Sequence, residues 1–290
     1  MKALITTVIF IVTIILFCTS CEVDVTNDLS IANSAPRLVV EGGLERNLNT
    51  PVTRQRIRLT TTRDFLNNDE TVPLVEDAVV TVTDGNMAYD FSYSGNGVYT
   101  NTELIPELNT TYTLTVLWND EEYEARETLT EVPAFDRVYS EFEEETLITD
   151  EGYFAKFDTT DPAGVANFYY HRVARNGAFI IVPDPGNSDV LVLSDEFFDG
   201  QKRVGVNPND EILFALGDEA TVQQLGISER YYNYLYEVFV QSSSGGFSFV
   251  GNPPPESVRG NVRNMTNSDN RPLGFFYTAD VAEATFEITE

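Results

Sequence analysis

The sequence predicts a mainly β protein, in which an N-terminal β-sandwich domain is followed by a second β-rich domain that carries one amphipathic helix. Three observations support this fold class. Apolar and polar residues alternate in many short segments, turn residues separate these segments, and a single segment shows the 3.6-residue period of a helix. With 290 residues, of which 42% are hydrophobic, the chain is long enough for two packed domains.

The first two strand candidates are the segments RLVVEGGL and VTRQRIRLTTT, which begin at Arg37 and Val52. Successive side chains of a strand point to opposite faces of the sheet. Ile57 and Leu59 therefore share one face of the second segment. The opposite face carries three of the few cations in the chain: Arg54, Arg56 and Arg58.

Further alternating segments complete the N-terminal domain. In DAVVTVTDG, Val80 and Val82 share one face, and the turn dipeptide Asp84–Gly85 follows. YDFSY and GVYT flank a Gly-Asn-Gly turn, and TTYTLTVLW is followed by a polar turn and by EYEARETLT. Short strands with this spacing predict a β-sandwich over residues 37–131.

A domain boundary is expected near Pro133, so that the second domain spans residues 132–290. Its strand candidates are YFAKFDTT, ANFYYHRVARNG, AFIIVPD, DVLVLSD, EILFALG, LGFFYTA and ATFEIT. A helix is predicted over residues 229–241, because Ser228 is a favourable N-cap and an apolar stripe with helical spacing follows. We expect this stripe to pack against a sheet. It consists of Tyr232, Leu235, Tyr236 and Phe239.

The N-terminus has the pattern of a targeting segment. An apolar run over residues 3–17 ends near Cys18 and Cys21, the only cysteines in the chain. The run is short for a membrane span, and small residues precede Cys21, as in lipoprotein signal peptides. We expect residues 1–20 to be a signal peptide, Cys21 to carry the lipid, and residues 21–36 to be a tether. The alternatives are a retained membrane anchor or a redox or metal pair with C-x-x-C spacing.

The chain is strongly acidic, because 46 Asp and Glu residues stand against 18 Lys and Arg and give a formal net charge of −28. This charge repels nucleic acid, so no nucleic-acid partner is expected. The sequence has no G-x-S-x-G, H-E-x-x-H, P-loop or dinucleotide-binding motif, and His171 is its only histidine. We expect a protein that is not an enzyme and needs no cofactor, with His171 buried and hydrogen bonded.

Two segments are candidates for contacts with a ligand or partner. The arginines of the second strand would suit an anionic ligand or an acidic partner, although a solvated face paired with neighbouring acids is the common alternative. A proline-rich loop is the second candidate, and it contains Pro253, Pro254 and Pro255.

A third segment, DPGNSDV, has oxygen ligands for a structural calcium ion, but it lacks the spacing of an EF-hand loop. A simple turn is therefore the favoured interpretation, and no metal site is predicted there. The oxygen atoms would come from Asp184, Asn187 and Asp189.

An ordered series of segments resembles the DUF4249 family of Bacteroidota outer-membrane lipoproteins: APRLVVEGGL, DAVVTVTDG, GNGVYT, TYTLTVLWNDEEYEARETL, VPAFDRV, ISERYYNYLYEVFVQ, NPPPESVRGNV and LGFF. NPPPES departs from the family, which more often has an aromatic residue after Asn-Pro. The part from DAVVTVTDG to TYTLTV is also similar to the transthyretin-like, or carboxypeptidase-regulatory, β-sandwich. The first domain is therefore expected to be immunoglobulin-like or transthyretin-like.

The resemblance implies an envelope location with TonB-dependent receptors nearby, and it implies no particular reaction. We expect a lipid-anchored outer-membrane protein that is a non-enzymatic accessory or binding subunit of a TonB-dependent transport system. Its partners would be the membrane, through the anchor, and a TonB-dependent β-barrel receptor. Glu22 and Asp24 resemble surface-export signals, which favours the cell surface over the periplasmic face. The alternatives are a stand-alone surface binder of a glycan, peptide or metal ligand and, less favoured, a hydrolase with two carboxylates.

Overall fold

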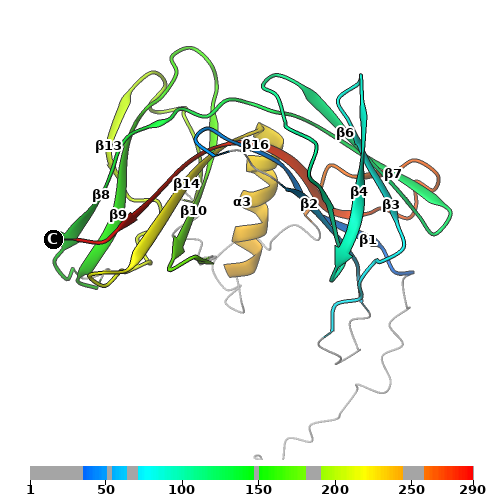
Figure 1. The fold of residues 1–290 in the computed structure, drawn as a ribbon, viewed down its shortest axis with the longest axis horizontal. Coiled ribbons are helices and arrows are strands. Elements are labelled where there is room, and N and C mark those ends of the chain that lie inside the picture. The colour runs from blue at the N-terminus through cyan, green and yellow to red at the C-terminus, as the bar shows by residue number, and fades with distance from the viewer. Residues whose placement is uncertain are drawn as a thin grey trace, which may run out of the picture. The chain divides into compact units, whose positions relative to one another are not determined.

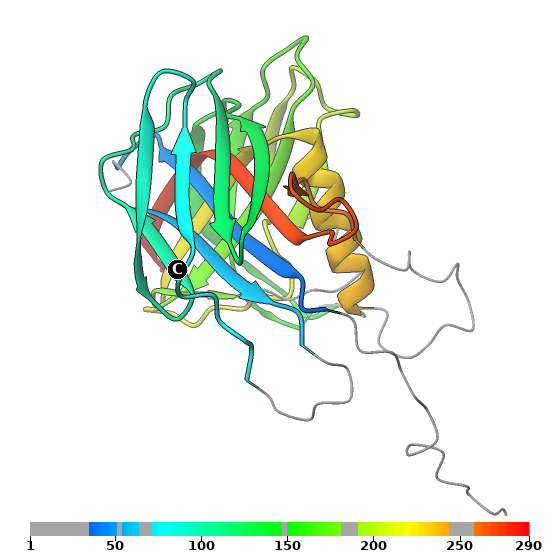
Figure 2. The same cartoon turned by 90° about the vertical axis from the view of Figure 1, so that its right-hand side faces the viewer.

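A long mixed β-sheet organises the chain, and the helix α3 (Glu229–Ser243) packs against its C-terminal part (Figures 1 and 2). The computed structural model describes residues 35–50, 54–63, 71–146, 150–180, 191–243 and 258–289. The expected signal peptide and most of the tether lie outside these residues. The predictions of a mainly β fold and of a helix beginning at Glu229 are confirmed.

The strands of the first half are β1 (Leu38–Asn47), β2 (Gln55–Thr61), β3 (Val79–Thr83), β4 (Ala88–Gly95), β5 (Val98–Asn101), β6 (Thr111–Trp118) and β7 (Glu121–Thr128). The strands of the second half are β8 (Phe135–Glu143), β9 (Gly152–Thr160), β10 (Phe168–Arg175), β11 (Ala178–Ile180), β12 (Val192–Ser194), β13 (Lys202–Val206), β14 (Glu219–Ile227), β15 (Arg263–Asn264) and β16 (Leu273–Glu287). The large sheet has the order β11-β10-β14-β16-β1-β2-β5-β4-β3-β6-β7-β15, with β12 paired to β10, and the small sheet has the order β13-β9-β8.

The first half of the chain folds into a β-sandwich, as the alternation predicts. Ile57 and Leu59 of β2 are fully buried, and so is Val82 of β3. They belong to one apolar cluster with residues of β1, β4, β5, β6, β7 and β16, which means that the two layers of the sandwich enclose a single core. Burial of this apolar surface is the main stabilising contribution to this half.

The sheet runs across the boundary expected near residue 132. β1 pairs in parallel with β16, and β16 pairs antiparallel with β14, so strands from both halves lie side by side (Figure 1). Residues 36–290 accordingly form one compact unit. The two backbones approach closely at Gly43, where an added Cβ would overlap the carbonyl oxygen of Tyr277.

Helix α3 covers the face of the sheet formed by β10, β14 and β16. Its first turn is capped as predicted, because the Tyr231 amide donates to the Ser228 hydroxyl at 3.2 Å. The buried stripe is rotated from the expected one: Tyr231, Leu235 and Phe239 are buried, whereas Tyr236 is 40% exposed. The rotation follows from packing, since Tyr231 stacks on the ring of Tyr277 in β16 at 4.7 Å. No helix within the described residues is long and apolar enough to cross a membrane.

The small sheet covers the opposite face, so this half has three layers. Here several strand predictions are wrong or incomplete. The segment EILFALG is not a strand, because its only β-bridge is the isolated one between Phe214 and Tyr153. The ring of Phe214 packs in the core between the two sheets. The segments LGFFYTA and ATFEIT are one continuous strand, β16, and the sequence did not indicate β8, β13 or β14.

The close approach of β1 and β16 leads to a stability prediction. Replacing Gly43 with Ala forces a methyl group into the Tyr277 backbone, and we expect the free energy of unfolding to fall by about 1–3 kcal/mol. Urea denaturation measures the change. Val79→Ala, on the exposed face of β3, is the control and should change stability by no more than about 0.5 kcal/mol. Equal effects of the two substitutions would contradict the packing argument.

Candidate functional site

The three predicted arginines line a cavity of about 540 Å³ on the face of the sheet that also carries Tyr277. β1, β2, β10, β11 and β16 all contribute to its walls. Its side chains are mainly charged and aromatic. They include Arg54, Arg56, Arg58 and Arg172 together with Glu41, Glu45, Phe179 and Tyr277.

Strand register explains why these side chains meet. Arg56 of β2 lies opposite Gly43 of β1, and Arg58 lies opposite Glu41, so the arginines project on the same face as the glutamates of β1. Gly43 in turn lies beside Tyr277 of β16. Gly43 has no side chain, and the backbone of Tyr277 occupies the space in which its Cβ would lie.

An ion pair forms one wall of this arginine cavity. The two Nη atoms of Arg172 donate to the two carboxylate oxygens of Glu45 at 2.9 and 3.1 Å, and the Tyr277 hydroxyl donates to Oε1 at 2.7 Å. Burial raises the pKa of Glu45, but the charge and hydrogen bonds of Arg172 outweigh it, and the pKa lies below its ordinary value. Burial and the Glu45 charge raise the pKa of Tyr277, so its hydroxyl remains a donor.

One N–H donor of Arg172 has no acceptor among the described residues. Its Nε atom is buried and has no hydrogen-bond partner among the described residues. The ring of Phe179, which is 52% exposed, lies 5.4 Å from the guanidinium carbon and covers it. A buried N–H without a partner costs free energy, so an acceptor that reached this nitrogen would be bound favourably.

Arg54, Arg56 and Arg58 form few ion pairs that would compete with a bound anion. Arg58 and Glu41 form a 3.3 Å salt bridge, but both side chains are exposed, and such pairs contribute little. Arg54 and Arg56 form no salt bridge with a carboxylate of the described residues. In a chain with 46 acidic residues, this concentration of unpaired cations is a local exception to the overall charge.

The other predicted contact residues fall elsewhere. Cys21 and the proline-rich loop with Pro253, Pro254 and Pro255 lie outside the described residues, as does the DPGNSDV segment. His171 is described and is buried, with Nε2 placed 3.2 Å from the Gln224 side-chain oxygen. The expectation of a buried, hydrogen-bonded histidine is therefore confirmed.

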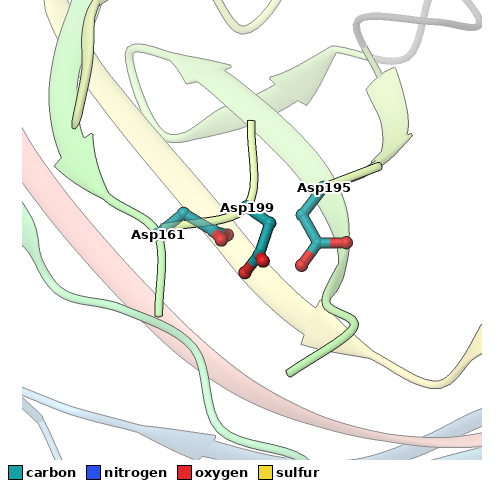
Figure 3. A group of neighbouring side chains, drawn as sticks. All are labelled: Asp161, Asp195 and Asp199. Atoms are coloured by element: carbon teal, nitrogen blue, oxygen red, sulfur yellow. The ribbon is translucent and has the colours of Figure 1, made fainter. Parts of the chain in front are cut away.

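Three carboxylates also gather near β10, and the sequence did not indicate them. Asp161, Asp195 and Asp199 each have an oxygen within 4.8 Å of the others, and Asp199 lies between the other two in Figure 3. Oxygen atoms at this spacing are chemically suited to a cation such as Ca²⁺. These carboxylates also accept hydrogen bonds from backbone amides of the surrounding loops, including that of Gly200 to Asp161 at 3.0 Å and that of Gly164 to Asp199 at 2.7 Å.

Neither the aspartate group nor the complete cavity has a sequence signature. The aspartates lie in three separate loop positions, and an acid-rich chain offers many other carboxylates. Arg172 lies in β10, which is far from β2 in the sequence. Without the order of the strands in the sheet, the sequence does not show that Arg172 and the arginines of β2 lie on the same face. Only the spacing of Arg54, Arg56 and Arg58 gave a usable signal.

The lowered pKa of Glu45 predicts a pH-dependent stability. The pair contributes fully above the pKa of an unfolded Glu, about 4.3, and its contribution is lost as the pH falls through the lower folded-state pKa. We expect Glu45→Gln to lower the free energy of unfolding by about 1–3 kcal/mol at neutral pH and to weaken the loss of stability on acidification. Urea titrations across pH measure both effects. Glu196→Gln, at an exposed position, is the control, and an equal change there would contradict the assignment.

Comparison with known proteins identifies the family. A family model described as a domain of unknown function, DUF4249, matches residues 21–285. A search of the curated proteins finds no match. The matched region includes the arginine cavity, the aspartate group and helix α3. The chain therefore belongs to the DUF4249 family.

Proposed function

We propose that this protein is a non-enzymatic binding subunit, anchored in the outer membrane through a lipid on Cys21, that serves a TonB-dependent receptor. The observation that carries the proposal is the arginine cavity, with unpaired Arg54 and Arg56 in a strongly acidic chain. The occupant we propose is a carboxylate-rich segment of the receptor.

The anchor and the receptor rest on the sequence. The apolar run, the small residues before Cys21 and the acidic residues after it have the pattern of a lipoprotein. Two or three acyl chains give a stable membrane attachment, because each buried methylene contributes about 0.8 kcal/mol. The resemblance to outer-membrane lipoproteins supports a TonB-dependent receptor as the partner, and Glu22 and Asp24 support the cell surface.

The cavity supports binding through its charge and its donors. Guanidinium groups form paired hydrogen bonds with carboxylates, and these bonds are stronger than neutral ones. Arg54, Arg56 and the unpartnered Nε of Arg172 would supply the donors.

The residues that line the cavity support a binding role over catalysis. Among the described residues, none of them is a Ser, Cys or His, and Glu45, the best-buried carboxylate of the cavity, forms an ion pair with Arg172. A hydrolase with two carboxylates needs one acid with a raised pKa, whereas the pKa of Glu45 is lowered. A stand-alone binder of an anionic glycan or peptide is the second candidate, and the exposed ring of Phe179 favours it as a stacking surface.

The lipid anchor is tested by substitution of the two cysteines. We expect Cys21→Ser to abolish incorporation of a labelled fatty acid and to leave the chain at its precursor mass, because the acylated thiol is missing. Metabolic labelling followed by electrophoresis measures both. Cys18→Ser is the matched control and should be labelled and processed normally. Labelling of the Cys21→Ser chain would contradict the anchor.

The receptor contact is tested by co-purification from detergent-solubilised outer membranes. We expect Arg54→Ser combined with Arg56→Ser to reduce the recovered β-barrel protein by about tenfold, because it removes the two proposed donors to acidic groups. Quantitative mass spectrometry measures the ratio of the two proteins.

The matched control for this experiment is Arg137→Ser combined with Lys202→Ser, which removes two exposed cations of the small sheet outside the cavity. It should leave recovery unchanged. Wild-type protein that purifies without any barrel partner would contradict the accessory role. Unchanged recovery with the cavity variant would contradict the assignment of the contact to the arginine cavity.

A further inference from the structure

A second cavity concentrates positive charge more strongly than the first. Its volume is about 410 Å³, and it lies between the segment that leads into β15 and the turn that leads into β16. Among the described residues, its lining includes no Asp or Glu, although the chain has 46 of them. They include four arginines: Arg37, Arg259, Arg263 and Arg271.

The backbone beneath these arginines is held firmly. Gly260 packs so closely on Gly274 that a Cβ at position 260 would overlap the Gly274 carbonyl oxygen. The Asn261 side chain accepts from the amide of Phe276 at 3.0 Å and donates to its carbonyl at 2.7 Å. Val262 is buried in the core of the sandwich. The flanking Arg259 and Arg263, on the same short segment, are exposed.

The four arginines lack acidic partners. None of them forms a salt bridge with a carboxylate of the described residues, although Arg37 donates through Nε to the backbone oxygen of Arg271. A neighbouring cavity of about 730 Å³ shares Arg259 and Arg263, and its other two arginines are paired. Like charges held together repel one another, so a bound anion would relieve an unfavourable arrangement.

We propose that this second cavity binds a phosphate group attached to an apolar body, as in a phospholipid headgroup or a soluble phosphate ester. A phosphate monoester carries nearly two negative charges and three acceptor oxygens, and a lone carboxylate would leave more of the four guanidinium groups uncompensated. Ser268 adds a hydroxyl donor. Val258, Pro272 and Leu273 supply apolar wall for the body of the ligand.

The proposal is tested by calorimetric titration of the wild-type mature chain in detergent with hexyl phosphate and, for comparison, with hexanoate. Hexyl phosphate is expected to bind more tightly. Arg259→Gln combined with Arg263→Gln and Arg271→Gln should weaken its binding by more than about tenfold, because charged hydrogen bonds are lost. Arg137→Gln combined with Lys202→Gln, at exposed positions outside both cavities, is the control and should bind as the wild type does. Circular dichroism melting checks that each variant is folded.

A further arm distinguishes the two sources of the phosphate. Mixed micelles that contain phosphatidic acid should bind more tightly than hexyl phosphate if the ligand is a lipid headgroup, and less tightly if it is a soluble ester. Absence of hexyl phosphate binding, equal binding of hexanoate, or unchanged binding by the folded triple variant would overturn the proposal. Receptor co-purification does not depend on these arginines, so failure here leaves the proposed function intact.

Discussion

From Val39 to Asn47, β1 pairs in parallel with β16, and the rest of the structure depends on this ladder. β16 presents Phe276 to the core of the sandwich and Phe275 to the cluster under α3, so one strand supplies side chains to both cores. A partly buried ion pair joins the two strands: Asp280 is fully buried, its Oδ1 lies 2.8 Å from Nε of Arg46, and its Oδ2 accepts a hydrogen bond from the amide of Val132 at 3.2 Å. The residues at the expected domain boundary are thus attached to the shared strand, and separating the two halves would break both of these contacts of Asp280.

The same joint creates the arginine cavity. The glycine at position 43 is required because the backbones of β1 and β16 are in close contact, and Gly43 and Tyr277 line the cavity together with Arg54, Arg56 and Arg58. Glu45 and Tyr277, one on each strand of the ladder, then hold Arg172 in place. The packing of the sheet and the proposed recognition therefore share residues.

Charge is distributed unevenly over this acidic protein. Cations such as Lys156 and Arg46 are paired with carboxylates. Arginines without a salt bridge to a described carboxylate line two cavities, one beside β2 and one beside the start of β1 and β16. Net negative charge keeps such a chain soluble and repels most anions at long range. In the proposed function, the arginine clusters select at close range those anions that fit the cavity, because a guanidinium group favours paired acceptors.

The alternation of apolar and polar residues was sufficient to predict strands with one buried face, such as β2 and β3. The N-cap residue Ser228 was sufficient to predict where α3 begins. Alternation was insufficient for β14, in which Val222, Gln223 and Gln224 are all buried, because a strand covered on both faces does not alternate. It also divided β16 in two, since the sequence does not reveal that Asp280 is buried and paired with Arg46. The sequence by itself determined that Arg54, Arg56 and Arg58 share a face and that the chain is strongly acidic. Only the tertiary structure decided that Arg172 and Tyr277 join them, because that depends on the order of strands far apart in the chain.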